Sequence, residues 1–213
     1  MKALGKLYLT NLMIIGTTAF LLSCASIPEL KLHYQLPPGS SSLKGKRVVL
    51  SLIDSRTSKD ILGPGARDEF GSFSGNVTYS VADFNDPGFK IGPHKPATAF
   101  KESFRRRLEG MGVKVLSNRS EGETEFELEL KEFVLDLIGR KWVVKLDYEA
   151  RLIGEGKTLS MQAVNGQGER LKAVGRGGAH KLMGEIFTDT VNRLDIYGLF
   201  KQSDSMTRKN NTL

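Results

Sequence analysis

Residues Thr124–Leu152 read TEFELELKEFVLDLIGRKWVVKLDYEARL and carry the clearest structural pattern in the chain. Apolar and charged residues alternate along Phe126–Leu130, which indicates a strand with one buried face and one face in water. The alternation slips by one position at Lys131–Glu132, so a β-bulge is expected there. It resumes along Trp142–Leu152 after a turn at 138–141. The stretch therefore predicts two long antiparallel strands joined by a tight turn.

Helices and further strands are expected on both sides of this pair. Arg47–Ile53 is almost continuously apolar and predicts an interior strand. Pro96–Met111 and Leu182–Leu194 carry apolar residues at helical spacing. Turns at Gly154–Gly156 and at Asn165–Gly166 predict three or four antiparallel strands in all. This order of elements predicts an α+β fold, a two-layer sandwich of an antiparallel or mixed sheet with two helices packed on one face.

The period of two also predicts which side chains form the core. Trp142, Leu146 and Tyr148 share one face of their strand and are expected beneath the two helices. Glu149 has the opposite phase and is expected on a polar, solvated face. On that basis Glu149→Ala should change the free energy of unfolding by less than about 0.5 kcal/mol.

The N-terminus has the features of an export signal. Lys2 and Lys6 precede an apolar stretch, Leu7–Leu22, and the single cysteine of the chain, Cys24, follows it. A membrane-spanning helix would need about 20 apolar residues, and a plain secretory signal usually ends in an A-x-A-like site. Leu21-Leu-Ser-Cys24 instead resembles a bacterial lipobox, in which the cysteine is acylated and becomes the first residue of the mature protein. The resemblance implies a signal peptide at 1–23 and a lipid anchor, carrying palmitate or similar chains, on Cys24.

The rest of the chain divides by composition. Residues 24–44 are rich in Pro, Ser and Gly and are expected to form a lipidated tether. Residues 45–201 form the single α+β domain, and the polar residues 202–213 are expected to be a flexible tail. Within the domain, the Gly- and Pro-rich segment 57–96 is the first place to look for a binding surface.

Composition excludes several classes of function. The chain has 31 basic and 24 acidic side chains, a net charge of +7 that is too diffuse to indicate a nucleic-acid-binding protein. With one cysteine it forms no internal disulfide. The three histidines, His33, His94 and His180, lack the spacing of metal ligands.

Other short motifs have a structural interpretation that is simpler than a catalytic one. Gly71–Gly75 has its serine misplaced for a nucleophile elbow and is expected to be a loop turn. Gly175–Gly178 lacks the Lys-Ser/Thr of a P-loop and is expected to join a strand to a helix. Arg105–Arg107 could contact lipid headgroups, but two of the three arginines lie away from the Phe100–Phe104–Leu108 stripe, so a solvated helix face is expected. Asp54–Arg56 is expected to be an ion pair that organises its loop. No nucleophile, base and orienting group come together, so we expect neither an enzyme nor a cofactor or metal site.

Two family resemblances bear on function. Leu43–Leu50 with Asp54–Arg56, the Phe100–Val115 helix-to-strand region and Thr188–Asp195 together resemble the YajG-type bacterial lipoproteins. This resemblance implies a non-enzymatic outer-membrane lipoprotein that faces the periplasm and binds a protein or lipid partner, with inner-membrane anchoring as the alternative. His33-Tyr-Gln-Leu-Pro37 is similar to the Tyr-Tyr-x-Leu-Pro start of PqiC-type proteins, which implies an auxiliary subunit of a lipid-transporting ABC system.

Overall fold

A computed structural model of the protein describes residues 28–83, 89–117 and 123–210. Its larger sheet has five strands in the order β5-β2-β6-β7-β8. The strands are β2 (Arg47–Asp54), β5 (Lys114–Leu116), β6 (Glu125–Ile138), β7 (Lys141–Gly154) and β8 (Lys157–Leu171). β5 and β6 pair parallel to β2, whereas β6, β7 and β8 form an antiparallel meander. The sheet is therefore mixed, and β2 is an interior strand as expected.

The meander follows the alternation in the sequence closely. The register between β6 and β7 shifts between Leu130 and Glu132, which confirms the predicted bulge. Tight turns join β6 to β7 at 139–140 and β7 to β8 at 155–156, also as predicted. The prediction of a hairpin turn at Asn165–Gly166 is wrong, because both residues lie inside β8 and pair with β7. A Cβ on Gly166 would lie 1.9 Å from Thr190 Oγ1, so this glycine allows a helix to approach the strand closely.

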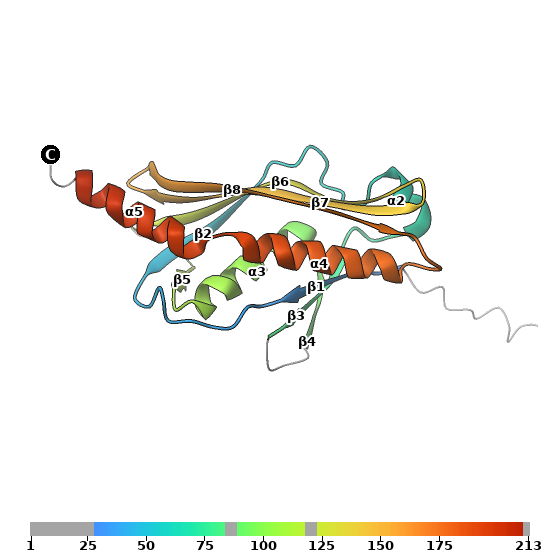
Figure 1. The fold of residues 1–213 in the computed structure, drawn as a ribbon, viewed down its shortest axis with the longest axis horizontal. Helices are drawn as coiled ribbons and strands as arrows, with labels where there is room; N and C mark the ends of the chain where they lie inside the picture. The colour runs from blue at the N-terminus through green and yellow to red at the C-terminus, as the bar shows by residue number, and fades with distance from the viewer. Residues whose placement is uncertain (1–27, 84–88, 118–122, 211–213) are drawn as a thin grey trace, which may run out of the picture.

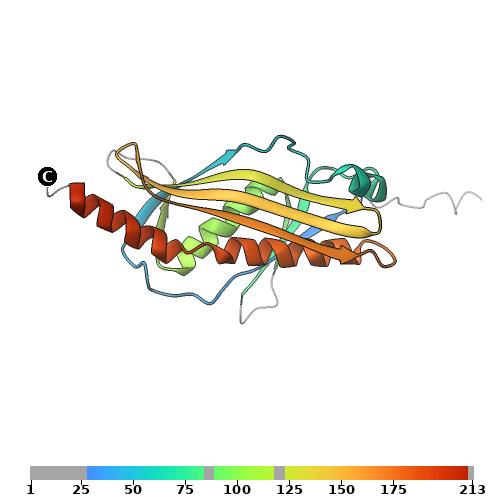
Figure 2. The same ribbon diagram turned by 45° about the horizontal axis from the view of Figure 1, so that its top comes forward.

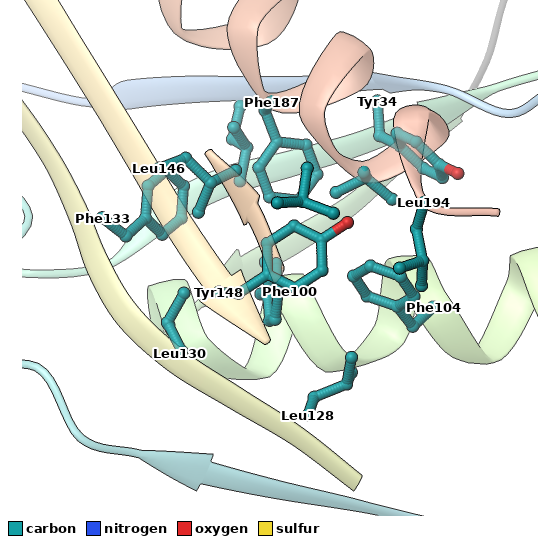
Figure 3. Close-up of a cluster of buried hydrophobic side chains, with 14 of the residues drawn as sticks. Tyr34, Phe100, Phe104, Leu128, Leu130, Phe133, Leu146, Tyr148, Phe187 and Leu194 are labelled. Atoms are coloured by element: carbon teal, nitrogen blue, oxygen red, sulfur yellow. The ribbon is translucent and has the colours of Figure 1, made fainter. Parts of the chain in front are cut away.

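Two helices cover one face of this sheet, namely α3 (Pro96–Gly110) and α4 (Gly177–Arg193) (Figures 1 and 2). Pro96 occupies the first turn of α3, where its fixed φ and missing N–H are tolerated. Beneath the helices Tyr148 is the centre of an aromatic cluster (Figure 3). Its ring centroid lies 5.1 Å from that of Phe100 and 5.3 Å from that of Phe104. Trp142 and Leu146 are fully buried in the same layer. The predicted core and the two-layer α+β class are confirmed.

A second, three-stranded sheet lies beyond α4 in Figure 1, in the order β1-β3-β4. Its strands are β1 (Leu30–Gln35), β3 (Val77–Ala82) and β4 (Phe89–His94). β1 belongs to the segment expected to be a tether, yet Leu30, Leu32 and Tyr34 are fully buried. The period-two pattern LKLHYQ explains the strand, although flanking Pro and Ser residues dominate the composition of the segment. The folded domain therefore includes β1, which lies within the segment expected to be a tether.

The described residues also form the helices α2 (Pro64–Phe70) and α5 (Ile196–Asn210). α5 extends through most of the segment 202–213, which was expected to be a flexible tail. Leu199 and Phe200 are buried, and the Ser160 hydroxyl of β8 donates to the Leu199 carbonyl at 2.9 Å. Packing of this apolar stripe against the meander orders a segment whose polar composition alone suggested a frayed end.

Candidate binding site

A cavity among the described residues lies at the start of the 57–96 segment, the segment in which sequence analysis places the search for a binding surface. It has a volume of about 590 Å³ and opens between residues 56–67 and the edge of β6 and β7. Its wall carries charges of both signs, from Arg56, Asp60, Arg67, Lys131, Glu132 and Lys145. Such a mixed lining suits a polar ligand or a polar segment of a partner rather than an acyl chain.

Arg56, which lines this cavity, is paired with Asp54. Arg56 Nε and Nη2 donate to the two carboxylate oxygens of Asp54 at 2.8 and 2.9 Å. The hydrogen bonds from Arg56 lower the pKa of Asp54 from 3.8 to about 2. The Lys59 ammonium adds hydrogen bonds to the backbone carbonyls of residues 54 and 56. The pair holds the loop in shape, which confirms the structural interpretation.

Asp136 of β6 fixes the next part of the wall. Its Oδ1 accepts the backbone N–H of Ala66 in α2 at 3.1 Å and that of Leu137 at 2.8 Å. A carboxylate at this helix start satisfies an otherwise unpaired amide and interacts favourably with the helix dipole. Gly65 must be glycine, because a Cβ there would lie 2.1 Å from the Leu137 carbonyl oxygen. Sequence reasoning missed this contact, since it joins residues far apart in the chain.

The polar face of the meander adjoins the cavity, and its charged side chains are joined in a network of ion pairs. Arg151 is bonded to Glu127 at 2.9 Å and to Glu129 at 2.7 Å, and it also pairs with Glu149. Lys131 pairs with Glu149 at 2.9 Å. The hydrogen bond from Lys131 lowers the pKa of Glu149. Glu149 is only 8% exposed. The strand phase predicted for Glu149 is right, but its solvated environment is wrong because neighbouring side chains cover it.

The three histidines lie in different places. His33 on β1 is hydrogen-bonded to Ser80 on β3 at 3.1 Å, and His94 ends β4. His180 Nδ1 accepts the backbone N–H of Lys31 at 3.2 Å, and burial lowers the pKa of this imidazole. Among the residues that the structure describes, no group of three His, Cys, Asp or Glu side chains is placed to hold a metal ion.

The Gly-rich motifs both have the structural roles expected of them. Gly71 has φ of +52° and ends α2, so 71–75 is a loop turn. Residues 175–178 connect β8 to the first turn of α4. Nothing in their geometry provides a nucleophile.

The Arg105–Arg107 cluster divides into two kinds of residue. Arg105 and Arg106 pair with Glu102 on the exposed side of α3, as expected for a solvated face. Arg107 points inward instead and donates to backbone carbonyls at the end of α4, including that of Leu194 at 2.6 Å. The helical spacing separates this third arginine from the other two, because it stands three residues after the buried Phe104.

Cys24 lies outside the described residues. No helix within the part of the chain that the structure describes is long and apolar enough to cross a membrane.

Comparisons with known proteins show a shared fold. No family model matches the sequence, and no curated protein matches it. The chain is similar to a solved structure from Xanthomonas campestris, of the family described as DUF330, with 14% identity and a TM-score of 0.52. That match covers 85% of this chain and 99% of the other.

Two solved lipoproteins are also similar, but at TM-scores too low to support an argument. Rare lipoprotein B from Shewanella oneidensis matches with 16% identity and a TM-score of 0.36, over 79% of this chain and all of the other. Lipoprotein GNA1162 from Neisseria meningitidis matches with 13% identity and a TM-score of 0.30, over 70% and 96% of the two chains. The chain thus has the α+β fold of the Xanthomonas protein.

Proposed function

We propose that this chain is a lipid-anchored, non-enzymatic lipoprotein of the bacterial cell envelope, of the YajG type. The observation that carries the proposal is the position of Cys24. It follows a basic and apolar export signal and stands just before Leu30, where β1 starts. A cysteine in that position is available for acylation without disturbing the core.

The domain itself is suited to binding. Its cavity beside β6 presents arginine, lysine and carboxylate groups at the surface, and these groups are held by ion pairs and backbone hydrogen bonds. Such a preformed polar surface recognises a partner by charge and shape. We place the domain on the periplasmic side of the outer membrane. Ala25 rather than Asp follows the cysteine, which agrees with outer-membrane sorting under the rule of enteric bacteria. The partner is a protein or a lipid of the envelope.

Metabolic labelling with palmitate tests the anchor. Wild-type protein should incorporate label and remain in the membrane fraction without detergent, whereas Cys24→Ala should incorporate none. Equal labelling of the two proteins would contradict the proposal. Separation of inner and outer membranes on a density gradient then locates the labelled protein. Crosslinking in intact cells, followed by identification of the attached molecules, tests partner binding.

An auxiliary subunit of a lipid-transporting ABC system is the second candidate. It is favoured by the Tyr34-Gln-Leu-Pro37 motif, which belongs to the ordered domain. Tyr34 is fully buried, donates its hydroxyl to Asn192 Oδ1 at 2.8 Å and packs edge-on against Phe187. This candidate predicts that an ATPase and a substrate-binding subunit copurify with the full-length protein from detergent-solubilised membranes. The YajG-type candidate predicts that they do not.

A further inference from the structure

Large exposed apolar side chains gather at one end of the molecule. Ile138 is 61% exposed, Leu171 is 70% exposed and Val174 is fully exposed. Leu171 pairs with Lys141 across β7 and β8, and the Lys172 N–H donates to the carbonyl of residue 140 at 2.8 Å. The β6–β7 turn and the segment after β8 are therefore neighbours. Figures 1 and 2 place them at the opposite end from the C-terminal helix α5.

Basic residues surround these apolar side chains. We call residues 138–141 and 171–176 the anchor end; these two segments contain Arg140, Lys141, Lys172 and Arg176 and no acidic residue. Lys141 and Lys172 pair with Glu169 and Glu69, which lie outside the two segments. Arg176 lies over the Phe70 ring, 5.3 Å from its centroid. Arg140 is exposed and has no ion pair among the described residues.

The start of β1 lies beside the anchor end. The Lys31 N–H bonds to His180, which stands in the first turn of α4 shortly after Val174. The His180 ring contacts Phe70, and Phe70 contacts Trp142 at the start of β7, with centroids 5.9 and 6.1 Å apart. β1 therefore begins next to the turn and the segment that carry the exposed apolar residues.

Chain length then limits how far this end can lie from the bilayer. Only residues 25–29 separate Cys24 from Leu30. At about 3.3–3.6 Å per residue, the chain from Cys24 to Leu30 spans at most roughly 20 Å. An acyl anchor on Cys24 therefore holds the anchor end near the headgroups, whereas α5 lies at the far end of the domain (Figure 1).

We propose that the anchor end is a membrane-docking surface for anionic phospholipid. Ile138, Leu171 and Val174 enter the interfacial region, and the basic side chains of both segments lie at the phosphate groups. Insertion of apolar side chains and attraction of basic side chains to anionic lipid each bind a membrane only weakly. Together they would strengthen the attachment that the acyl chains provide. The proposal rests on the proposed function, because acylation of Cys24 brings this end to the membrane. It also predicts the orientation of the domain, with α5 pointing away from the membrane.

The test uses the full-length acylated protein, reconstituted in vesicles of phosphatidylethanolamine and phosphatidylglycerol. Val174→Cys introduces one free thiol at the anchor end, and Met206→Cys is the matched control at an exposed site on α5. Each thiol carries an environment-sensitive fluorophore. At position 174 we expect a blue shift of the emission and its loss to spin-labelled lipid, and at position 206 we expect neither. Equal emission and equal quenching at the two positions would overturn the proposal.

Further arms separate the causes of a negative result. The mass of the intact protein reports acylation of Cys24, so an unacylated chain refutes the proposed function, and equal quenching of an acylated chain refutes docking alone. Arg140→Glu should reduce the quenching at position 174, and so should vesicles of phosphatidylcholine only. Undiminished quenching in phosphatidylcholine would overturn the assignment to anionic lipid. Shielding of position 174 in cells but not in these vesicles would assign the surface to a protein partner instead.

Discussion

Arg107→Ala is expected to destabilise the domain by about 2–4 kcal/mol, although the residue belongs to a run of three arginines. Its guanidinium donates three hydrogen bonds to backbone carbonyls, those of Val191 at 2.6 Å, Asn192 at 3.0 Å and Leu194 at 2.6 Å. These carbonyls stand at the end of α4, where the last turn has no partners within the helix. A cation at this end also interacts favourably with the helix dipole.

The magnitude follows from two opposing effects. Hydrogen bonds to a charged group contribute about 1.5–3 kcal/mol each, so three such bonds give a large gross stabilisation. Burial opposes it, because it disfavours the charged guanidinium and lowers the pKa of Arg107. Water also reaches part of the site once the side chain is removed. The net loss is therefore about that of one to two bonds. Arg107→Lys should lose roughly half as much, since one ammonium cannot reach all three carbonyls.

The two preceding arginines provide matched controls. Arg105 and Arg106 make ion pairs with Glu102 on the outer side of α3. Pairs of this kind contribute about 0.2–1 kcal/mol, so Arg105→Ala and Arg106→Ala should have small effects. Urea unfolding of the chain from residue 25 onward, followed by the fluorescence of the buried Trp142, measures all the variants. If Arg107→Ala shifts the midpoint no more than Arg106→Ala, the capping role is refuted.

Predictions for four further variants use the same unfolding assay. Leu146→Ala should lower the free energy of unfolding by about 2–5 kcal/mol because it leaves a cavity. Glu149→Ala should lower it by about 1–2 kcal/mol because two basic partners lose their carboxylate. An effect of Glu149→Ala below about 0.5 kcal/mol would contradict the place of Glu149 in the ion-pair network. The folded-state pKa of Asp54 is lowered from 3.8 to about 2, so its stabilisation of about 2 kcal/mol is complete above pH 4 and lost as the pH falls towards 2. Asp54→Asn should therefore weaken the domain at pH 7 and make little difference at pH 2, and a deficit that persists at pH 2 would exclude the ionised carboxylate as the cause. Gly166→Ala should destabilise the domain because the added Cβ would meet Thr190. Adding Thr190→Ser to this variant should not restore the stability, since the hydroxyl oxygen is the atom nearest to the Cβ. An unchanged urea midpoint for Gly166→Ala would show that α4 does not pack against β8 at this position.

Local periodicity was sufficient for much of the fold. The alternation along Thr124–Leu152 predicted the long strands, their turn and the bulge, because each of these depends on neighbours one or two residues away. The spacing of Phe100 and Phe104 likewise predicted the buried stripe of α3. The predicted export signal and the lipobox at Cys24 are linear motifs, so their prediction needs no knowledge of the fold.

Elements that depend on distant parts of the chain needed the tertiary structure. β1 has the period of a strand, but it becomes one only because β3 and α4 bury its apolar face and satisfy its backbone. Gly166 has the sequence context of a turn, yet it lies in a strand because a helix packs against it. In both cases the deciding contact is made by residues that are close in space and far apart in sequence.

The same reason separates the charged residues. The helical period separates two of the arginines at 105–107 from the apolar stripe, but it does not say what the third one binds. Glu149 likewise looks like any other polar position on a strand. Their roles differ because a charged group takes its energy from the groups around it, and packing alone decides whether those groups are water, carbonyls or opposite charges. Periodicity along the chain is therefore enough to predict the long strands of the meander and the helices α3 and α4, and the lipid anchor at Cys24 stays a prediction from a linear motif. Which charged groups are buried depends on contacts between residues that are distant in the sequence, and the fold alone brings those residues together.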